Sequence, residues 1–236
     1  MAPRRRFDAL LFTCEHGGNQ IPARYKNIFR GEDKLLATHR GYDIGALPVA
    51  KALAKDMGVP LFFSTTSRLV VDLNRSIGHK TAFSEITAPL LPSEKDHITA
   101  KYYAPYRQSV TEWLQTAIKS KKRVLHLSIH SFTPVLKGEV RNAEIGILYD
   151  PKRPLELGFA HDLHRQLVGM QDLYRVRKNY PYLGYADGFQ TSLRKIFGAR
   201  VYAGLEIEMN QGVIHDREGQ KSMIALFSEA FAALGL

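Results

Sequence analysis

Short apolar runs alternate with longer amphipathic stretches along the whole 236-residue chain. The short runs are typical of buried strands, because they are rich in branched and aromatic side chains and lie between turn residues. They predict strands over residues 7–14, 60–65, 123–130, 143–149, 173–177 and 201–209. The longer stretches place apolar side chains at helical spacing and predict helices over residues 44–57, about 96–121, 155–168, 188–197 and 217–234. This alternation predicts an α/β sandwich with a mostly parallel sheet.

Neither a repeat nor a linker interrupts the alternation, so residues 1–236 are predicted to form one domain. Cys14 is the only cysteine, which excludes an internal disulfide framework and a zinc site built on cysteine pairs, and fits a reducing compartment. No apolar stretch approaches the roughly 18 residues of a membrane span. The basic residues 1–6 lead into a run too short for a signal peptide. We therefore expect a cytoplasmic protein without a membrane partner.

The formal net charge of +10 raises the question of a nucleic-acid partner. The basic residues are spread along the chain, however, and no helix-turn-helix, zinc-finger or RNA-binding motif accompanies them. The pattern favours either a solvated basic surface or arginines that line a pocket for a small anionic molecule. The oligomeric state does not follow from the sequence.

Two histidines lie where predicted strands end, which is where the active sites of such folds gather. His16 follows the first strand, in a loop whose Gly17 and Gly18 allow a ligand to approach the backbone closely. His130 ends the run 123–130, on the polar face that alternates with an apolar face. Both histidines are candidate metal ligands, although a hydrogen-bonded turn histidine fits His16 equally well. His126 lies deeper in the same strand and is expected to be a core residue.

A third metal ligand has two candidates. Asp43 precedes a predicted helix, so it could cap that helix or turn its carboxylate to the metal. Asn19 lies three residues after His16 and is either the competing third ligand or a residue that supports a ligand by a hydrogen bond. Two histidines, one carboxylate and an open position make a standard hydrolytic zinc site, although such ligands also accept other divalent metals.

Two glutamates alternate with apolar residues in the predicted strand 201–209. A buried carboxylate is costly unless it is paired or used in chemistry. Glu208 lies nearer the carboxyl end of the strand and is therefore the predicted general base. Glu206 lies deeper, and a structural pairing with an arginine is the better expectation for it.

Several polar residues suit the binding of a substrate carboxylate. Arg75 offers a bidentate fork and Asn74 an amide donor, and Arg68 and Arg141 could add to this clamp. Ordinary surface ion pairs are the alternative for these arginines. Tyr182 lies in a Pro-Tyr-x-Gly turn, where it could close over a substrate or simply pack.

These motifs together resemble the N-formylglutamate amidohydrolase family, over about residues 10 to 230. The matching segments are residues 14–19, 39–43, 67–75, 130–131, 179–184 and 205–211. The resemblance implies a three-layer α/β sandwich with a mixed, mostly parallel sheet, of the phosphorylase/hydrolase-like type found in zinc carboxypeptidases and aspartoacylases. It also implies zinc-dependent hydrolysis of the amide of an N-acyl acidic amino acid such as N-formylglutamate, with a small anionic substrate as the partner. In such a reaction Glu208 would accept the proton of a zinc-activated water.

One motif departs from the wider carboxypeptidase group, which uses a His-x-x-Glu pair of zinc ligands. Here Asn19 stands where that glutamate is expected, and Asp43 is the preferred substitute because a carboxylate neutralises zinc better than an amide does. Two other functions stay open. One is hydrolysis of another N-acyl amino acid or of a small peptide, and the other is a non-catalytic binding module or basic nucleic-acid binder on the same fold.

Overall fold

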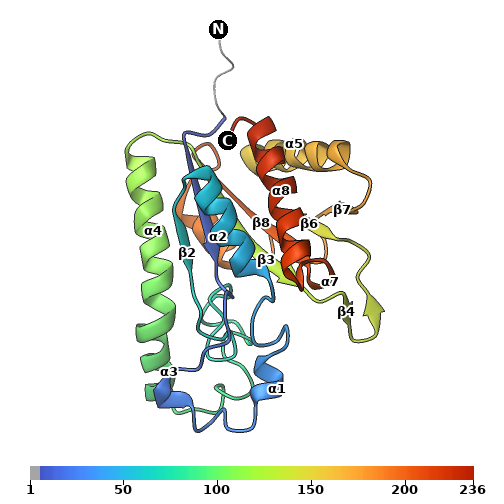
Figure 1. The fold of residues 1–236 in the computed structure, drawn as a ribbon. Coiled ribbons are helices and arrows are strands. Elements are labelled where there is room, and N and C mark those ends of the chain that lie inside the picture. The colour runs from blue at the N-terminus through green and yellow to red at the C-terminus, as the bar shows by residue number, and fades with distance from the viewer. Residues whose placement is uncertain (1–5) are drawn as a thin grey trace.

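A six-stranded sheet runs through the middle of the computed structural model, which describes residues 6–236 (Figure 1). Its strands are β1 (Ala9–Cys14), β2 (Leu61–Phe63), β3 (Val124–Phe132), β6 (Ile145–Leu148), β7 (Val176–Lys178) and β8 (Tyr202–Asn210). They lie in the order β2-β1-β3-β8-β6-β7. Only the β6–β8 pair is antiparallel, so the sheet is mixed and mostly parallel, as predicted. The short hairpin of β4 (Val135–Leu136) and β5 (Glu139–Val140) was not predicted.

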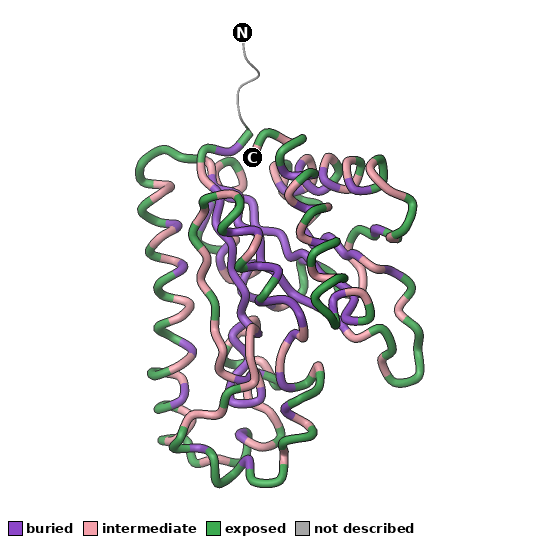
Figure 2. The backbone as a smooth tube through the Cα atoms, viewed as in Figure 1, coloured by how far each residue is buried: buried purple, intermediate pink, exposed green. Residues whose placement is uncertain are grey.

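Helices cover both faces of the sheet and complete the predicted three layers (Figure 1). One face packs against α2 (Ala46–Met57), α5 (Pro154–Met170) and α8 (Arg217–Ala233). The other face packs against α4 (Ala104–Lys119) and α6 (Phe189–Ile196). All nine residues of β3 and all nine of β8 are buried, as the central strands of Figure 2 show. None of the described helices is long and apolar enough to span a membrane.

The helix predicted over residues about 96–121 is interrupted. It begins as α3 (Pro92–Ile98), passes through η2 (Thr99–Tyr103), which is a wide π-helical turn, and continues as α4. Pro105 explains the wide turn, because it has no N–H to donate to the carbonyl four residues earlier. The helix also starts earlier than predicted, since Pro92 favours the first helical position.

A small lobe with its own apolar core lies beyond the carboxyl ends of β1 and β3 (Figure 1). It contains η1 (Ala23–Tyr25), α1 (Asp33–Leu36) and α3, and residues 64–91, which form no helix or strand apart from one bridge at Thr66. Its core gathers Tyr25, Phe29, Leu36, Leu69, Val70, Val71, Leu73, Ile98 and Tyr103. After β8 the chain passes through the short helix α7 (Gln211–Ile214) into α8. The lobe and the edge of the sheet together enclose the site described next.

Candidate metal and substrate site

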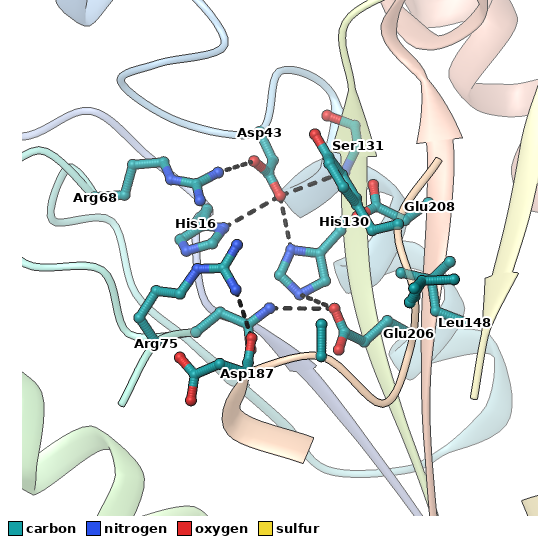
Figure 3. A pocket seen from close by; sticks show the side chains of 14 residues that line it. His16, Asp43, Arg68, Arg75, His130, Ser131, Leu148, Asp187, Glu206 and Glu208 are labelled. Carbon is teal, nitrogen blue, oxygen red and sulfur yellow. Dashed lines mark hydrogen bonds and ion pairs between the residues drawn. The ribbon is translucent and has the colours of Figure 1, made fainter. Parts of the chain in front are cut away.

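Three predicted metal ligands meet at the edge of the sheet (Figure 3). His16 follows β1, His130 lies near the end of β3, and Asp43 lies in the turn before α2. Each offers one ligand atom, and these atoms lie within 4.8 Å of one another. The backbone N–H of Asp43 donates to the carbonyl of His16 at 2.9 Å, which fixes the turn beside the strand. All three side chains are almost completely buried.

His16 is held by one nitrogen and leaves the other without a hydrogen bond. Its Nε2 lies 2.7 Å from Oδ1 of Asp72. Its Nδ1 faces Oδ2 of Asp43 at 3.4 Å and has no hydrogen-bond partner, although it is buried. A buried ring nitrogen without a partner is rare and requires an explanation, and a metal ion is one that fits.

His130 has the same orientation, but both of its nitrogens have partners. Its Nδ1 lies 2.8 Å from Oδ2 of Asp43, and its Nε2 lies 2.8 Å from Oγ of Ser128 and 3.1 Å from Oε2 of Glu15. Both histidines therefore turn Nδ1 toward Asp43 and Nε2 toward a carboxylate. This is the usual environment of histidine ligands in metal sites, so the residues present fit a divalent metal such as zinc.

Charge is concentrated in this cluster. Burial works to raise the pKa of Asp43, but His16 and His130 outweigh it and hold that pKa far below its ordinary value. Burial works to lower the pKa of His130, but hydrogen bonds to Asp43 and Glu15 raise it well above the ordinary value. Without a metal, a proton on His130 therefore balances part of the negative charge.

Arg68 bridges two carboxylates of the site. Its Nη1 lies 3.3 Å from Oδ1 of Asp43, and its Nη2 lies 2.6 Å from Oδ2 of Asp72. The guanidinium thus links Asp43, a predicted metal ligand, to Asp72, which holds His16. Arg68 was predicted to bind substrate, and the structure places it at the pocket wall with much of its charge already paired.

A pocket of about 410 Å³ opens beside the cluster, and both glutamates of β8 line it. Glu208 lies opposite Gly146 of β6, and a Cβ on Gly146 would come within 2.0 Å of the carbonyl oxygen of Tyr180. Oε2 of Glu208 is buried without a hydrogen bond. Burial raises the pKa of Glu208 to about 8, and the negative charges of Asp43 and Glu206 add to the shift.

Glu206 has an amide partner where an arginine was predicted. Nδ2 of Asn74 donates to its Oε2 at 3.1 Å, and Nε2 of His130 lies 3.9 Å from the same oxygen. Oδ1 of Asn74 accepts from the backbone N–H of Phe189 at 2.7 Å. Among the described residues no arginine forms an ion pair with Glu206. Asn74, predicted to bind substrate, therefore lines the pocket with both ends of its amide engaged.

The remaining predicted substrate ligands lie in or behind the pocket wall. Arg75 lines the pocket, and its Nη1 donates to the carbonyl of Asp187. Tyr182 also lines it, and the guanidinium of Arg141 lies 4.9 Å from the centre of the Tyr182 ring. Nη1 of Arg141 is buried and has no hydrogen-bond partner. The pocket thus has Arg75 in its wall and Arg141 behind Tyr182, in addition to Arg68.

Asn19, the competing third ligand, lies away from this wall. Its side-chain amide donates to the carbonyl of Leu36 at 3.1 Å, and Asn19 does not line the pocket. The two glycines before it were predicted to permit a tight backbone and the close approach of a ligand, and the structure shows the tight packing. A Cβ on Gly17 would lie 2.8 Å from a backbone oxygen of residue 64, and one on Gly18 would lie 2.7 Å from that of residue 65. The glycines make room for the neighbouring chain segment.

Sequence reasoning missed three side chains of the site, namely Glu15, Asp72 and Ser128. Each contacts a histidine of the cluster or its partner. A signal existed for two of them. Glu15 directly precedes His16 at the end of a buried strand, and Asp72 opens the segment that contains Arg75. Buried carboxylates of this kind require a cationic or hydrogen-bonding partner.

The fold and the site define a class: an α/β protein with a His-Asp-His cluster at the carboxyl edge of a mostly parallel sheet, where a metal could bind. Residues 8–215 match N-formylglutamate amidohydrolase, and the chain belongs to that family. This confirms the resemblance noted in the sequence and supports a hydrolase.

Two solved structures are similar over most of their length. A gene product of Agrobacterium tumefaciens has a TM-score of 0.81 and 26% identity, over 97% of this chain and 91% of that one. The N-formylglutamate amidohydrolase of Ralstonia eutropha has a TM-score of 0.69 and 19% identity, over 94% of this chain and 90% of that one. The second likeness shows the shared fold. No curated protein matches the chain.

Proposed function

We propose that the protein hydrolyses the amide bond of an N-acyl acidic amino acid such as N-formylglutamate, with zinc or another divalent metal held by His16, Asp43 and His130. The observation that carries the proposal is the buried, unpartnered Nδ1 of His16, which faces Asp43 within this cluster. Family membership supports the same chemistry. When bound, the metal would polarise the acyl carbonyl and lower the pKa of a water molecule toward about 7.

Glu208 is suited to move the proton. Its unpartnered Oε2 is buried in the pocket wall, so no hydrogen bond has to break before it accepts a proton. A carboxylate works best as base and then as acid when its pKa lies near the working pH, and the pKa of Glu208 is raised to about 8. Positive charge beside it lowers this pKa again, so Glu208 is ionised when the cation is present. It then takes the proton of water and gives it to the leaving nitrogen.

The arginines provide for the carboxylates of the substrate. Arg75 uses one N–H on the carbonyl of Asp187, which holds the guanidinium at the wall, and keeps others for a ligand. The guanidinium of Arg141 lies against the ring of Tyr182, and its buried Nη1 has no hydrogen-bond partner. A substrate carboxylate that reaches past the edge of this ring could therefore pair with Nη1. Arg68 adds positive charge. Asn74 stays a predicted substrate ligand, but it would first have to leave Glu206.

The decisive variant is Glu208→Gln, which removes the proton acceptor and keeps the shape. We expect the variant to retain its metal and to lose hydrolysis of N-formylglutamate, followed as formate release. Glu112→Gln makes the same change on the exposed side of α4, away from the pocket, and as the control it should keep the activity. Loss of metal in Glu208→Gln would assign that residue to the metal instead. A wild-type protein that holds one metal per chain but hydrolyses no N-acyl acidic amino acid would refute the proposal.

A second candidate substrate is a small acidic peptide, and a specific observation favours it. The pocket adjoins a second, more open hollow that shares Arg68, Arg75 and Tyr182 and continues to His39 and Lys80. An N-formylated dipeptide with an acidic second residue would place the side-chain carboxylate of that residue in this basic hollow. We expect kcat/KM for N-formyl-Glu-Glu to exceed that for N-formyl-Glu-Ala, and Lys80→Met to reduce the difference. Equal values for both peptides would exclude the second subsite.

A further inference from the structure

Glu15 precedes His16 in the chain, yet its carboxylate contacts the other histidine. It is 1% exposed and lies at the end of β1, beside the last residues of β3. The geometry points to Glu15 as a positioning residue, which holds His130 with Nδ1 turned toward the metal. This inference rests on the metal site of the proposed function and adds to it a residue outside the three ligands.

Both oxygens of Glu15 are engaged. Oε2 accepts a hydrogen bond from Oγ of Ser128 and lies 3.1 Å from Nε2 of His130. Oε1 accepts from the hydroxyl of Tyr106 on α4 at 3.1 Å. The Tyr106 hydroxyl also lies 3.3 Å from the carbonyl oxygen of Phe62, so it is anchored to the neighbouring strand. The carboxylate therefore has one orientation, set by Ser128 and His130 of β3 and by Tyr106 of α4.

This orientation decides which nitrogen of His130 can bind a metal. A neutral imidazole carries its proton on one nitrogen and a lone pair on the other, and the hydrogen bond at one side selects the lone pair at the other. Glu15 and Ser128 accept from Nε2–H, so once His130 is neutral its lone pair lies on Nδ1, which faces Asp43. Glu206 lies 3.9 Å from Nε2 and is too far to replace Glu15.

The two histidines are supported unequally. Asp72, the support of His16, shares its charge with Arg68 at 2.6 Å. Among the described residues Glu15 forms no ion pair with an arginine or a lysine. The charge of Glu15 is therefore shared only with the neutral hydroxyls of Ser128 and Tyr106, and it makes the His130 ring the stronger electron donor. Carboxylates that orient histidine ligands in this way contribute typically 10-fold to 100-fold to metal affinity.

The test is the zinc affinity of Glu15→Gln, measured without substrate by competition with a chelator. We expect a dissociation constant about 10-fold to 100-fold higher than that of the wild type, and a changed absorption spectrum of the cobalt-loaded protein. Tyr106→Phe keeps the charge and frees the carboxylate from one side, so its effect should be smaller but in the same direction. Glu112→Gln, on the exposed side of the same helix, is the matched control and should bind zinc like the wild type.

Thermal unfolding of the metal-free variants separates positioning from a structural role. If Glu15 only stabilises the fold, the variants unfold at lower temperature while zinc affinity and the cobalt spectrum stay unchanged, and the inference is wrong. If Glu15→Gln fails to fold, an unchanged affinity in Tyr106→Phe leads to the same conclusion. A wild-type protein that binds zinc but hydrolyses nothing refutes the proposed function and leaves the role of Glu15 intact. Absence of zinc binding refutes both.

Discussion

Metal binding to this site should displace protons, because the metal-free cluster holds them where the metal would bind. The pKa of His130 is raised well above its ordinary value, because Asp43 and Glu15 outweigh the effect of burial. His130 therefore keeps its proton at a higher pH than an ordinary histidine does. Its Nδ1 has to lose that proton before it can bind a cation. Glu208 also holds a proton near neutral pH, because its pKa is raised to about 8. A cation beside Glu208 favours the ionised form and releases this proton as well.

The size of the effect follows from the number of protons. With a pKa of about 8, Glu208 is about 0.9 protonated at pH 7, and His130, whose pKa is raised well above its ordinary value, contributes in the same direction. Each proton released makes the apparent dissociation constant fall about 10-fold for each unit of rising pH. The sign is therefore fixed: affinity rises with pH between about pH 6 and pH 8, where these groups lose protons only when the metal binds.

Isothermal titration calorimetry with zinc, in buffers that differ in ionisation heat, counts the protons directly. At pH 7 we expect more than about 0.9 protons per zinc ion, because His130 contributes as well as Glu208, and about 0.9 fewer in Glu208→Gln. Glu112→Gln serves as the control and should release the same number as the wild type. An affinity that does not change with pH, or a proton count that Glu208→Gln leaves unaltered, would refute the charge arrangement described above.

Three further predictions concern packing, a buried ion pair and the substrate. Gly146→Ala should lower the free energy of unfolding by about 1–3 kcal/mol in urea denaturation, because the new Cβ would lie 2.0 Å from the carbonyl oxygen of Tyr180. A variant as stable as the wild type would show that the backbone at Tyr180 moves aside without cost. Glu156→Ala should lower the free energy of unfolding by about 3–5 kcal/mol in the same assay, since it leaves the guanidinium of Arg194 buried without its bidentate partner. A decrease of less than about 1 kcal/mol would contradict this reasoning. Arg75→Ala should raise KM for N-formylglutamate about 10-fold to 100-fold in steady-state kinetics, and an unchanged KM would remove Arg75 from the substrate site.

The sheet and its layers were predictable because burial imposes a period on the sequence. The run 123–130 alternates Leu125, Leu127 and Ile129 with polar residues, and the structure packs these three against the helices of one face. Strand ends that carry His16 and His130 had to meet at one edge, since parallel strands end on the same side. The position of Asp43 beside them followed only from the preference for a carboxylate ligand.

The support of the histidines was not predictable, because it depends on contacts between distant segments. Glu15 and His16 are neighbours in the chain, but alternation along the strand sends their side chains apart, and Glu15 contacts His130. Asp72 lies in a segment without helix or strand, where no period indicates which way a side chain points. Asn74 looked free to bind substrate, and only the structure shows its hydrogen bond to Glu206.

The lobe beyond the sheet has a consequence for how this protein could diversify. His130, Glu206 and Glu208 belong to buried central strands, whereas Arg68 and Arg75 belong to a loop that packs on a separate small core. Arg68 and Asp72 of that loop contact Asp43 and His16, so these two residues belong to the chemistry. Substitutions, insertions or deletions after them can alter which molecules are admitted without disturbing the strands that hold the reacting groups. Selection can therefore rewrite specificity and chemistry largely separately, and a directed-evolution library aimed at new substrates would best be confined to residues 75–91.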